Sequence, residues 1–398
     1  MSDSLVSGAI VAALERAALA VGRLDAALAG HTLRPAWTFW THLDTACRHA
    51  GTDGRKVDLF RLAAYLYGLP LKLNFNLAKG DRGADLSALA YAVNLRSWAS
   101  DPDHEQQRAR SEALALLHRI GDPHPALIGA ALGLRDWIAR EGGRAPIRAS
   151  LPVYLHERSV TRQVLPPLTG GDALKAGAFD PDSFTIRFLD ALERGAENAR
   201  GLLWTLETEW RQARMALAQT GRDGERASSR RPQAVDMLAA SPLLTVSALA
   251  HAIGATVEGA SRILDDLVRR EIAAEVTGMS GRGARRLYGL KRLLPIRAET
   301  TGARRRPSGG RPGRPKKILT PPFGELPEEP QGTATVEPTQ PPVWGHREPF
   351  AFDFEALDRL NAEAADRTRH VHRILERIAR GDKPFPDLAS TIDNEDPA

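Results

Sequence analysis

The sequence predicts a mainly α-helical protein with a small β-hairpin in its second half. Alanine and leucine dominate a composition that is 42% hydrophobic but only 6% aromatic, which favours helices over a large sheet. Apolar residues recur at helical spacing through most of the first half, whereas short strand-like runs occur only near 272–290. A chain of 398 residues is long enough for two or three domains. We therefore expect a helical N-terminal domain followed by a smaller mixed unit.

Residues 1–220 are expected to form the helical domain. In its first helix, over 5–29, apolar side chains alternate at intervals of four and three residues, and Gly30 is a natural stop. Three prolines, beginning with Pro152, predict that no long helix spans 148–170. Further helices are predicted over 37–49, 56–68, 84–98, 104–120, 125–140, 182–198 and 200–219.

A second folded unit is predicted over 232–297. The segment before it, GRDGERASSRR at 221–231, is polar and flexible and marks a domain boundary. Pro232 stands at the expected start of a helix that reaches Ala240.

The most informative segment of this unit reads LAHAIGATVEGASRIL, over 249–264. Ala250 lies four positions before Gly254, and Thr245 and Thr256 are suited to cap two successive helices. This pattern resembles the helix-turn-helix, in which the alanine lets two helices cross closely and the glycine takes the turn. The resemblance implies that the helix starting at Thr256 enters the major groove of DNA.

The outward residues of that helix are the candidate DNA contacts. Arg262 can approach a phosphate or a guanine edge, and Ser261 and Thr256 are short donors suited to the DNA backbone. Glu258 and Asp265 repel phosphates, so we do not expect a strong generic DNA binder. The alternative is a module that contacts a second subunit or another protein.

A basic hairpin is expected to follow the two helices. Residues 272–276 and 285–290 predict two strands around a glycine-bearing tip. Helices followed by a basic hairpin resemble the winged helix family, and the resemblance implies contacts between the wing and the edge of the minor groove. The wing arginines are Arg282, Arg285 and Arg286.

Residues 298–349 hold 11 of the 27 prolines and little apolar periodicity, so we expect a disordered or extended linker. Within it, GRPGRPKK at 310–317 resembles the AT-hook, a peptide that enters the narrow minor groove of A·T-rich DNA. The alternative is a basic flexible spacer. The candidate minor-groove contacts are Arg311, Arg314, Lys316 and Lys317.

A C-terminal helix is predicted over 350–381, because apolar residues again form one stripe and Gly381 follows it. We expect this helix to dock on the N-terminal domain or on a partner. The acidic tail over 382–398 is expected to fray.

Charge is divided unevenly along the chain. Residues 221–320 hold 20 Lys and Arg against 9 Asp and Glu, whereas residues 321–398 hold 8 against 16. A basic block beside an acidic tail indicates a polyanionic partner for the block. The alternative is a solvated basic linker.

No catalytic motif accompanies these features, neither a Walker loop nor a Gly-x-Ser-x-Gly elbow. Ordinary packing explains His42, Cys47 and His49 better than a metal site does. We therefore predict no catalytic residue, no metal and no cofactor. The single cysteine fits a reducing cytoplasm, and charges interrupt the apolar N-terminal stretch, so we expect neither a signal peptide nor a membrane span.

Two polar clusters of the helical domain are candidate sites. His118 and His124 flank a turn with Asp122, for which a surface loop is the better interpretation. The run His156-Glu157-Arg158 lies near a proline-rich strip and could line a ligand cleft, although nothing in it specifies a reaction.

Two wider resemblances rest on the helical domain. The run AVGRLD at 20–25 and the strip LPVYL at 151–155 resemble Fic-type proteins, which transfer nucleotide monophosphates. The catalytic His-x-Phe-x-Asp-Gly-Asn-Gly-Arg loop of that family has no counterpart here, so no catalytic residue is carried over. The strip RPAWTFW at 34–40 and the segment 148–172 resemble a bacterial family, common on plasmids of plant-associated bacteria. Its members join a helical domain of unknown function to a C-terminal helix-turn-helix domain.

Together these features predict a cytoplasmic DNA-binding protein that regulates transcription. Double-stranded DNA is the expected partner. A homodimer is expected because one helix-turn-helix contacts too few bases for strong selectivity. The alternatives are a diverged Fic-like nucleotidyl-transfer enzyme with a regulatory winged helix, and a plasmid-maintenance protein that represses its own operon.

Overall fold

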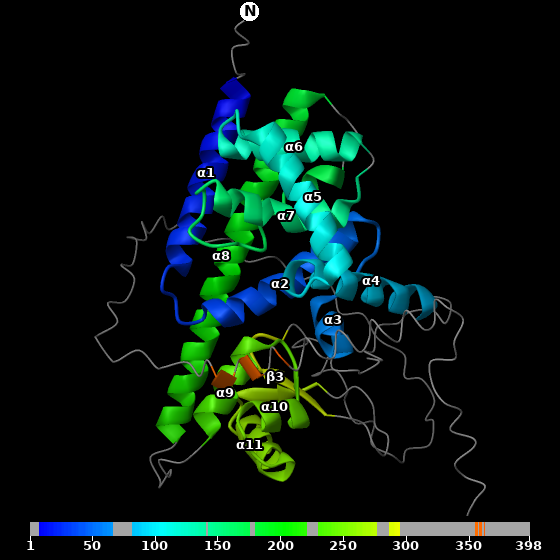
Figure 1. The fold of residues 1–398 in the computed structure, drawn as a ribbon. Coiled ribbons are helices and arrows are strands. Elements are labelled where there is room, and N and C mark those ends of the chain that lie inside the picture. Colours follow the sequence, from blue (N-terminus) through cyan, green and yellow to red (C-terminus); the bar gives the residue numbers. More distant parts are fainter. Residues whose placement is uncertain are drawn as a thin grey trace, which may run out of the picture. The chain divides into compact units, whose positions relative to one another are not determined.

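A computed structural model describes residues 8–66, 82–140, 142–175, 180–220, 230–276 and 286–294, with residues 355, 356, 358, 359 and 362. All of them belong to one of the two compact units of the chain, the unit made of Met1–Leu294 and Phe352–Ala398. This part is mainly α-helical, as the composition predicts, and contains one small antiparallel sheet (Figure 1). None of its helices combines the length and apolar composition that crossing a bilayer requires.

The helical body comprises the described residues between 8 and 220. Its elements are α1 (Gly8–Leu28), α2 (Arg34–Thr52), α3 (Leu59–Leu66), α4 (Arg82–Ser100), α5 (His104–Gly121), α6 (Ala126–Ala139), α7 (Arg144–Glu157), the 3-10 turn η2 (Gly171–Lys175) and α8 (Pro181–Thr220). Helix α1 lies along α8 (Figure 1), and α5, α6 and α7 pack against one another. Helix α2 contacts α3, α4 and α8, which makes it the link between these groups.

Local sequence explains how the body helices form and pack. In α1 the predicted apolar stripe is buried, and Ala13, Ala17 and Leu24 are at most 1% exposed. Helix α5 begins with a reciprocal cap, because Asp103 accepts a hydrogen bond from the Gln106 N–H and the Gln106 side chain accepts one from the Asp103 N–H. The small alanines therefore allow close helix approach, and the cap fixes where α5 begins.

One prediction for the body is wrong, and another is confirmed despite a buried proline. Helix α8 is continuous for 40 residues, where the sequence predicts a break near Arg200. Packing along α1 and a hydrogen bond from Trp37 Nε1 to the Ala199 carbonyl, 2.8 Å long, support the helix through this point. The prediction that no long helix spans 148–170 is confirmed, since α7 ends at Glu157. Pro152 nevertheless lies inside α7, where burial of Leu151 and its neighbours stabilises the helix despite the lost backbone donor.

The small lobe comprises the described residues between 230 and 294. Its elements are α9 (Arg231–Ala240), β1 (Leu244–Thr245), α10 (Val246–Ala252), α11 (Val257–Arg269), β2 (Ala273–Glu275) and β3 (Leu287–Leu290). The strand order is β1-β3-β2 with both pairs antiparallel, so Leu244 is opposite Tyr288 and Ala274 is opposite Gly289. The two strands of the predicted hairpin are confirmed. The sequence did not predict β1, because two residues are too few to show strand alternation.

Helix α9 connects the small lobe to the body. Every residue from Ala234 to Ala240 is buried, and α9 contacts α2 and α8 as well as α10, α11 and β3. Trp40 of α2 donates a buried hydrogen bond from Nε1 to the Ala239 carbonyl at 2.9 Å. The body and the lobe therefore share a core through α9. The predicted boundary at 221–231 falls almost entirely on residues outside the described ranges.

We predict that Gly254→Ala lowers the free energy of unfolding by about 1–2 kcal/mol. Gly254 has a φ of +60°, and the left-handed backbone costs an L residue roughly that much. The matched control is Gly201→Ala in the exposed interior of α8, where an added Cβ meets no atom within 4 Å. In this variant the free energy of unfolding should rise by about 0.5–1 kcal/mol, because alanine has a higher helix propensity than glycine. Urea unfolding followed by circular dichroism measures both, and effects of the same sign would contradict the assigned turn.

Candidate nucleic-acid interface

The connection between α10 and α11 is a compact turn with its backbone groups bonded. The N–H of Ala255 donates to the Ala250 carbonyl at 2.8 Å, and the N–H of Gly254 donates to the His251 carbonyl at 3.3 Å. This pair of bonds is the Schellman arrangement, which requires a left-handed residue just after the helix. Gly254 supplies that conformation, so its predicted place in the turn is confirmed.

Each of the two helices begins at a threonine cap. Thr245 Oγ1 accepts a hydrogen bond from the Ala248 N–H at 3.0 Å, and Thr256 Oγ1 accepts one from the Gly259 N–H at 3.1 Å. Both predicted N-caps are confirmed. The Thr256 hydroxyl retains its own hydrogen, which can still be donated to an acceptor such as a phosphate oxygen.

Helix α11 is anchored by one face and accessible on the other. Ala260, Leu264 and Leu267 are buried. On the other side, Val257 is 59% exposed and the Arg262 side chain is 78% exposed. The predicted contact residues at the start of α11 therefore belong to its solvent-facing edge.

The charged side chains of this edge neutralise one another. The Arg262 guanidinium lies 2.6 Å from the Glu258 carboxylate, one helical turn earlier. Ser261 Oγ donates a long hydrogen bond of 3.5 Å to Asp265. Exposed pairs one turn apart contribute only about 0.3–0.5 kcal/mol. A competing phosphate can therefore release Arg262 from Glu258 at little energetic cost.

Arg286 connects the hairpin to α11. One terminal nitrogen of its guanidinium lies 2.9 Å from Asp265 of α11 and 2.6 Å from Glu275 of β2. The guanidinium also stands 5.2 Å from the centre of the Tyr288 ring. This predicted wing residue therefore already has two carboxylate partners. In the structure these ion pairs hold the start of β3 beside α11.

The sequence did not reveal an arginine cluster around Asp266 at the end of α11. Arg231 and Arg270 each place Nε 2.9 Å from one carboxylate oxygen, and Arg269 lies 3.2 Å from the other. Three guanidinium groups around one carboxylate leave a local positive surplus. Arg269 and Arg270 are visible in the sequence as a basic last turn, whereas Arg231 reaches Asp266 only through the packing of α9 on α11.

Two arginines from outside α10 and α11 bond to carbonyls of the turn. The Arg230 guanidinium donates to Gly254, and Arg359 Nε donates to the Ala252 carbonyl at 2.6 Å. Arg359 belongs to the predicted C-terminal helix, whose five described residues are helical and include the fully buried Ala356. The sequence predicts that this helix docks on the N-terminal domain or a partner, and its described residue Arg359 contacts the small lobe.

The remaining predicted DNA contacts lie outside the described residues. They are Arg282, Arg285, Arg311, Arg314, Lys316 and Lys317.

The polar cluster of the helical body is an ion-pair network that joins α5 to α7. His118 lies 3.1 Å from Asp122 through Nδ1 and 2.7 Å from Glu157 through Nε2. Arg158 pairs with the same Asp122 at 2.6 Å. The network therefore uses the residues that the sequence assigned to a surface loop and to a possible cleft. Among the described residues, no three His, Cys, Asp or Glu side chains gather closely enough to hold a metal ion.

Comparison with known proteins adds no relative. No protein-family model matches the chain, and no curated protein sequence matches it at a significant level.

We predict that His118→Gln lowers the free energy of unfolding more below pH 6 than above pH 8. Partial burial opposes protonation of His118, but its hydrogen bonds to Glu157 and Asp122 prevail and raise its pKa. A raised pKa in the folded state contributes stability below the unfolded value of about 6.5, and this contribution disappears as the pH rises through the folded pKa. Denaturant unfolding across this range measures the difference. The exposed His104 provides the control, and equal pH dependence of His118→Gln and His104→Gln would contradict the prediction.

Proposed function

We propose that this chain is a DNA-binding transcriptional regulator whose small lobe is a winged helix-turn-helix. The observation that carries the proposal is the pair α10 and α11, joined by a glycine turn, with one edge of α11 open to solvent beside an antiparallel hairpin. A helix presented in this way fits the width of the DNA major groove. The additional strand β1, which closes the sheet against the hairpin, agrees with the resemblance to the winged helix family.

In the proposed complex the N-terminal half of α11 reads the DNA. Thr256 and Ser261 donate to phosphate oxygens, and Arg262 leaves Glu258 to reach a guanine edge or a phosphate. The helix N-terminus adds a partial positive charge that favours phosphates. This arrangement gives modest affinity by itself, because each cation of the outward edge begins in an ion pair.

The basic hairpin and linker supply the remaining affinity. Arg286 holds the start of β3 beside α11. Arg282 and Arg285 come shortly before Arg286 in the sequence, and we propose that they also contact DNA. Arg311 and Arg314 insert into the minor groove, with Lys316 and Lys317 on the phosphates.

Two copies of the chain bind one site. A single helix-turn-helix contacts too few base pairs for strong selectivity, so a second half-site about one helical turn away is needed. Sedimentation of the full chain with and without duplex DNA measures this stoichiometry.

We predict opposite effects for the two members of the exposed ion pair. Arg262→Ala removes a contact and leaves Glu258 facing phosphates, so affinity for a selected site should fall by about 1–3 kcal/mol and sequence discrimination should decrease. Glu258→Gln releases Arg262 and removes a repulsive charge, so affinity for a random duplex pool at low salt should rise several-fold. Gel shifts measure both changes. Weaker binding by Glu258→Gln, or unchanged binding by both variants, would contradict the proposal.

We predict that Arg311→Ala combined with Arg314→Ala weakens binding to A·T-rich duplexes more than to G·C-rich duplexes. The salt dependence of log affinity should also lose roughly one unit of slope per arginine removed. Binding isotherms at several salt concentrations measure the slope. Arg108→Ala with Arg140→Ala, two exposed arginines of the helical body, is the control for charge loss alone. Equal changes of affinity and salt slope in the two double variants would contradict the proposal that Arg311 and Arg314 bind the minor groove.

A further inference from the structure

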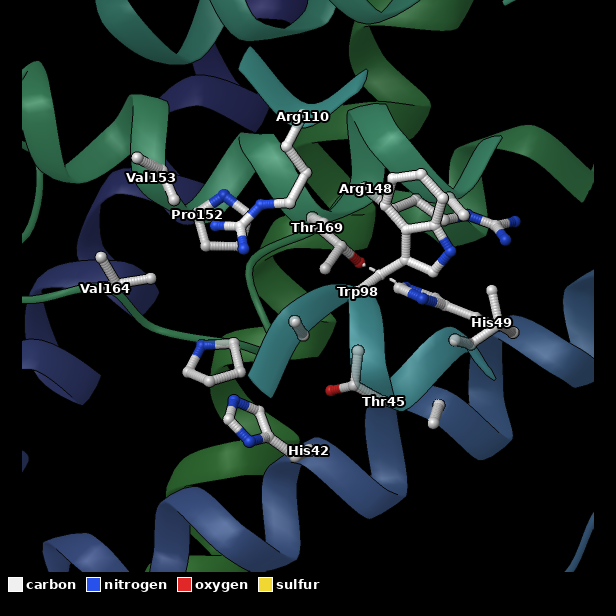
Figure 2. A pocket seen from close by; sticks show the side chains of 16 residues that line it. His42, Thr45, His49, Trp98, Arg110, Arg148, Pro152, Val153, Val164 and Thr169 are labelled. Atoms are coloured by element: carbon white, nitrogen blue, oxygen red, sulfur yellow. Dashed lines mark hydrogen bonds between the residues drawn. The ribbon is translucent and has the colours of Figure 1, made fainter. Parts of the chain in front are cut away.

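A partly open cavity of about 50 Å³ lies between helices of the body, away from the proposed DNA-binding edge. Its walls come from α2, α4, α5, α7 and the segment between α7 and η2 (Figure 2). The polar side chains that line it are His42, Thr45, His49, Arg110, Arg148 and Thr169. No acidic side chain lines this cavity.

Arg110 is a cation without a partner in this cavity. Its side chain extends from α5 into the ring of lining residues (Figure 2), and it is half-buried. The guanidinium makes no hydrogen bond or ion pair with any described residue, and burial lowers its pKa. Burying a charge without a partner is unfavourable, so the cavity is electrostatically incomplete as it stands.

Arg148 contributes a second unpaired donor. Its side chain is 1% exposed, and its two terminal nitrogens bind the Asp53 carboxylate at 2.7 and 3.1 Å. The remaining nitrogen, Nε, is buried without a hydrogen-bond partner. Asp53 also binds Arg144 and Tyr91, so its carboxylate is fully used outside the cavity.

The two histidines of the cavity supply neutral donors. Burial, and then the nearby charge of Arg96, lower the pKa of His42 to about 3. Burial and the charge of Arg148 hold the pKa of His49 well below its usual value. Both rings are therefore neutral near pH 7 and each keeps one N–H. His49 Nε2 is already hydrogen-bonded to Thr169 Oγ1 at 2.8 Å. The cavity thus combines the charge of Arg110 with neutral polar groups and no competing carboxylate.

The rest of the lining is apolar. It consists of Trp98, Pro152, Val153, Val164, Pro166 and several alanines. Since one water-sized group needs at least about 10–15 Å³ of such volume, the space accommodates roughly three to five non-hydrogen atoms. A ligand that suits both kinds of wall has one anionic end and a short hydrocarbon body.

We propose that this cavity binds a small aliphatic carboxylate, of the size of acetate or propionate. The carboxylate pairs with the Arg110 guanidinium, for which a planar two-oxygen anion is the matching partner. The alkyl end packs against Val153 and Val164. This site shares no residue with the proposed DNA-binding edge of α11, and it can be tested without nucleic acid.

Isothermal titration of the full chain with sodium propionate tests the proposal. Saturable binding of propionate is expected, with no binding of propionamide, which has the same shape without the charge. Propionamide binding as tight as that of propionate would overturn the assignment, as would an absence of saturable heat with propionate and acetate. Binding of inorganic phosphate in their place would also overturn it.

Variants on one helix identify the anion partner. Arg110→Gln should weaken propionate binding at least tenfold, and Arg110→Lys should weaken it less because the charge is kept. The control Arg108→Gln, exposed on the same helix α5, should bind as the unchanged protein does. Without ligand, Arg110→Gln should not lower the midpoint of thermal unfolding, because the Arg110 guanidinium has no partner among the described residues. Unchanged propionate affinity in Arg110→Gln, or loss of stability before ligand is added, would contradict the proposal.

Discussion

The buried carboxylate of Asp236 is the interaction on which the placement of the small lobe depends. It accepts a hydrogen bond of 2.7 Å from Trp210 Nε1 and lies 3.1 Å from Arg214 Nε, and both partners belong to the last part of α8. A carboxylate that is 2% exposed is stable as an anion only with such partners, and removal of one member of a buried pair typically costs about 3–5 kcal/mol. Asp236 therefore fixes α9 to α8, and α9 in turn carries α10, α11 and β3.

This attachment shapes the proposed DNA-binding surface. Because α9 is buried from Ala234 to Ala240, the small lobe has one side committed to the body and the edge of α11 left for a partner. The arginines around Asp266 add a second connection between α9 and α11. Helix α11 is thus held in place through α9, while the ion pairs on its outward edge remain weak enough to exchange.

Much of this fold follows from local sequence signals. Periodic apolar residues predicted most helices within a few positions, and threonine and glycine predicted both caps and the turn, because these signals lie within single helices or at their ends. The failures occur where tertiary packing overrides local preference. Helix α8 continues through Gly201 against α1, where the sequence predicts a break. The two-residue strand β1 forms only because β3 lies beside it.

In the candidate sites, too, contacts within one helix can be predicted from the sequence, whereas contacts between elements cannot. The pair Glu258 and Arg262 can be found from sequence, since opposite charges four residues apart on a helix meet. The partners of Arg286 cannot, because they come from α11 and β2. The cavity around Arg110 is harder still to predict, because its walls come from four helices and a loop. An arginine that lacks a carboxylate is recognisable only after the fold has excluded every candidate partner.

The most direct measurement of the central claim is photocrosslinking from the edge of α11. A benzophenone amino acid placed at Val257 of the full chain, or at the similarly exposed Leu19 of α1 as a control, is irradiated with a labelled pool of random duplex DNA at low salt. The account predicts crosslinks from position 257 that disappear at high salt, and none from position 19. Crosslinks from position 19 with none from position 257 would show that the small lobe does not bind DNA through α11.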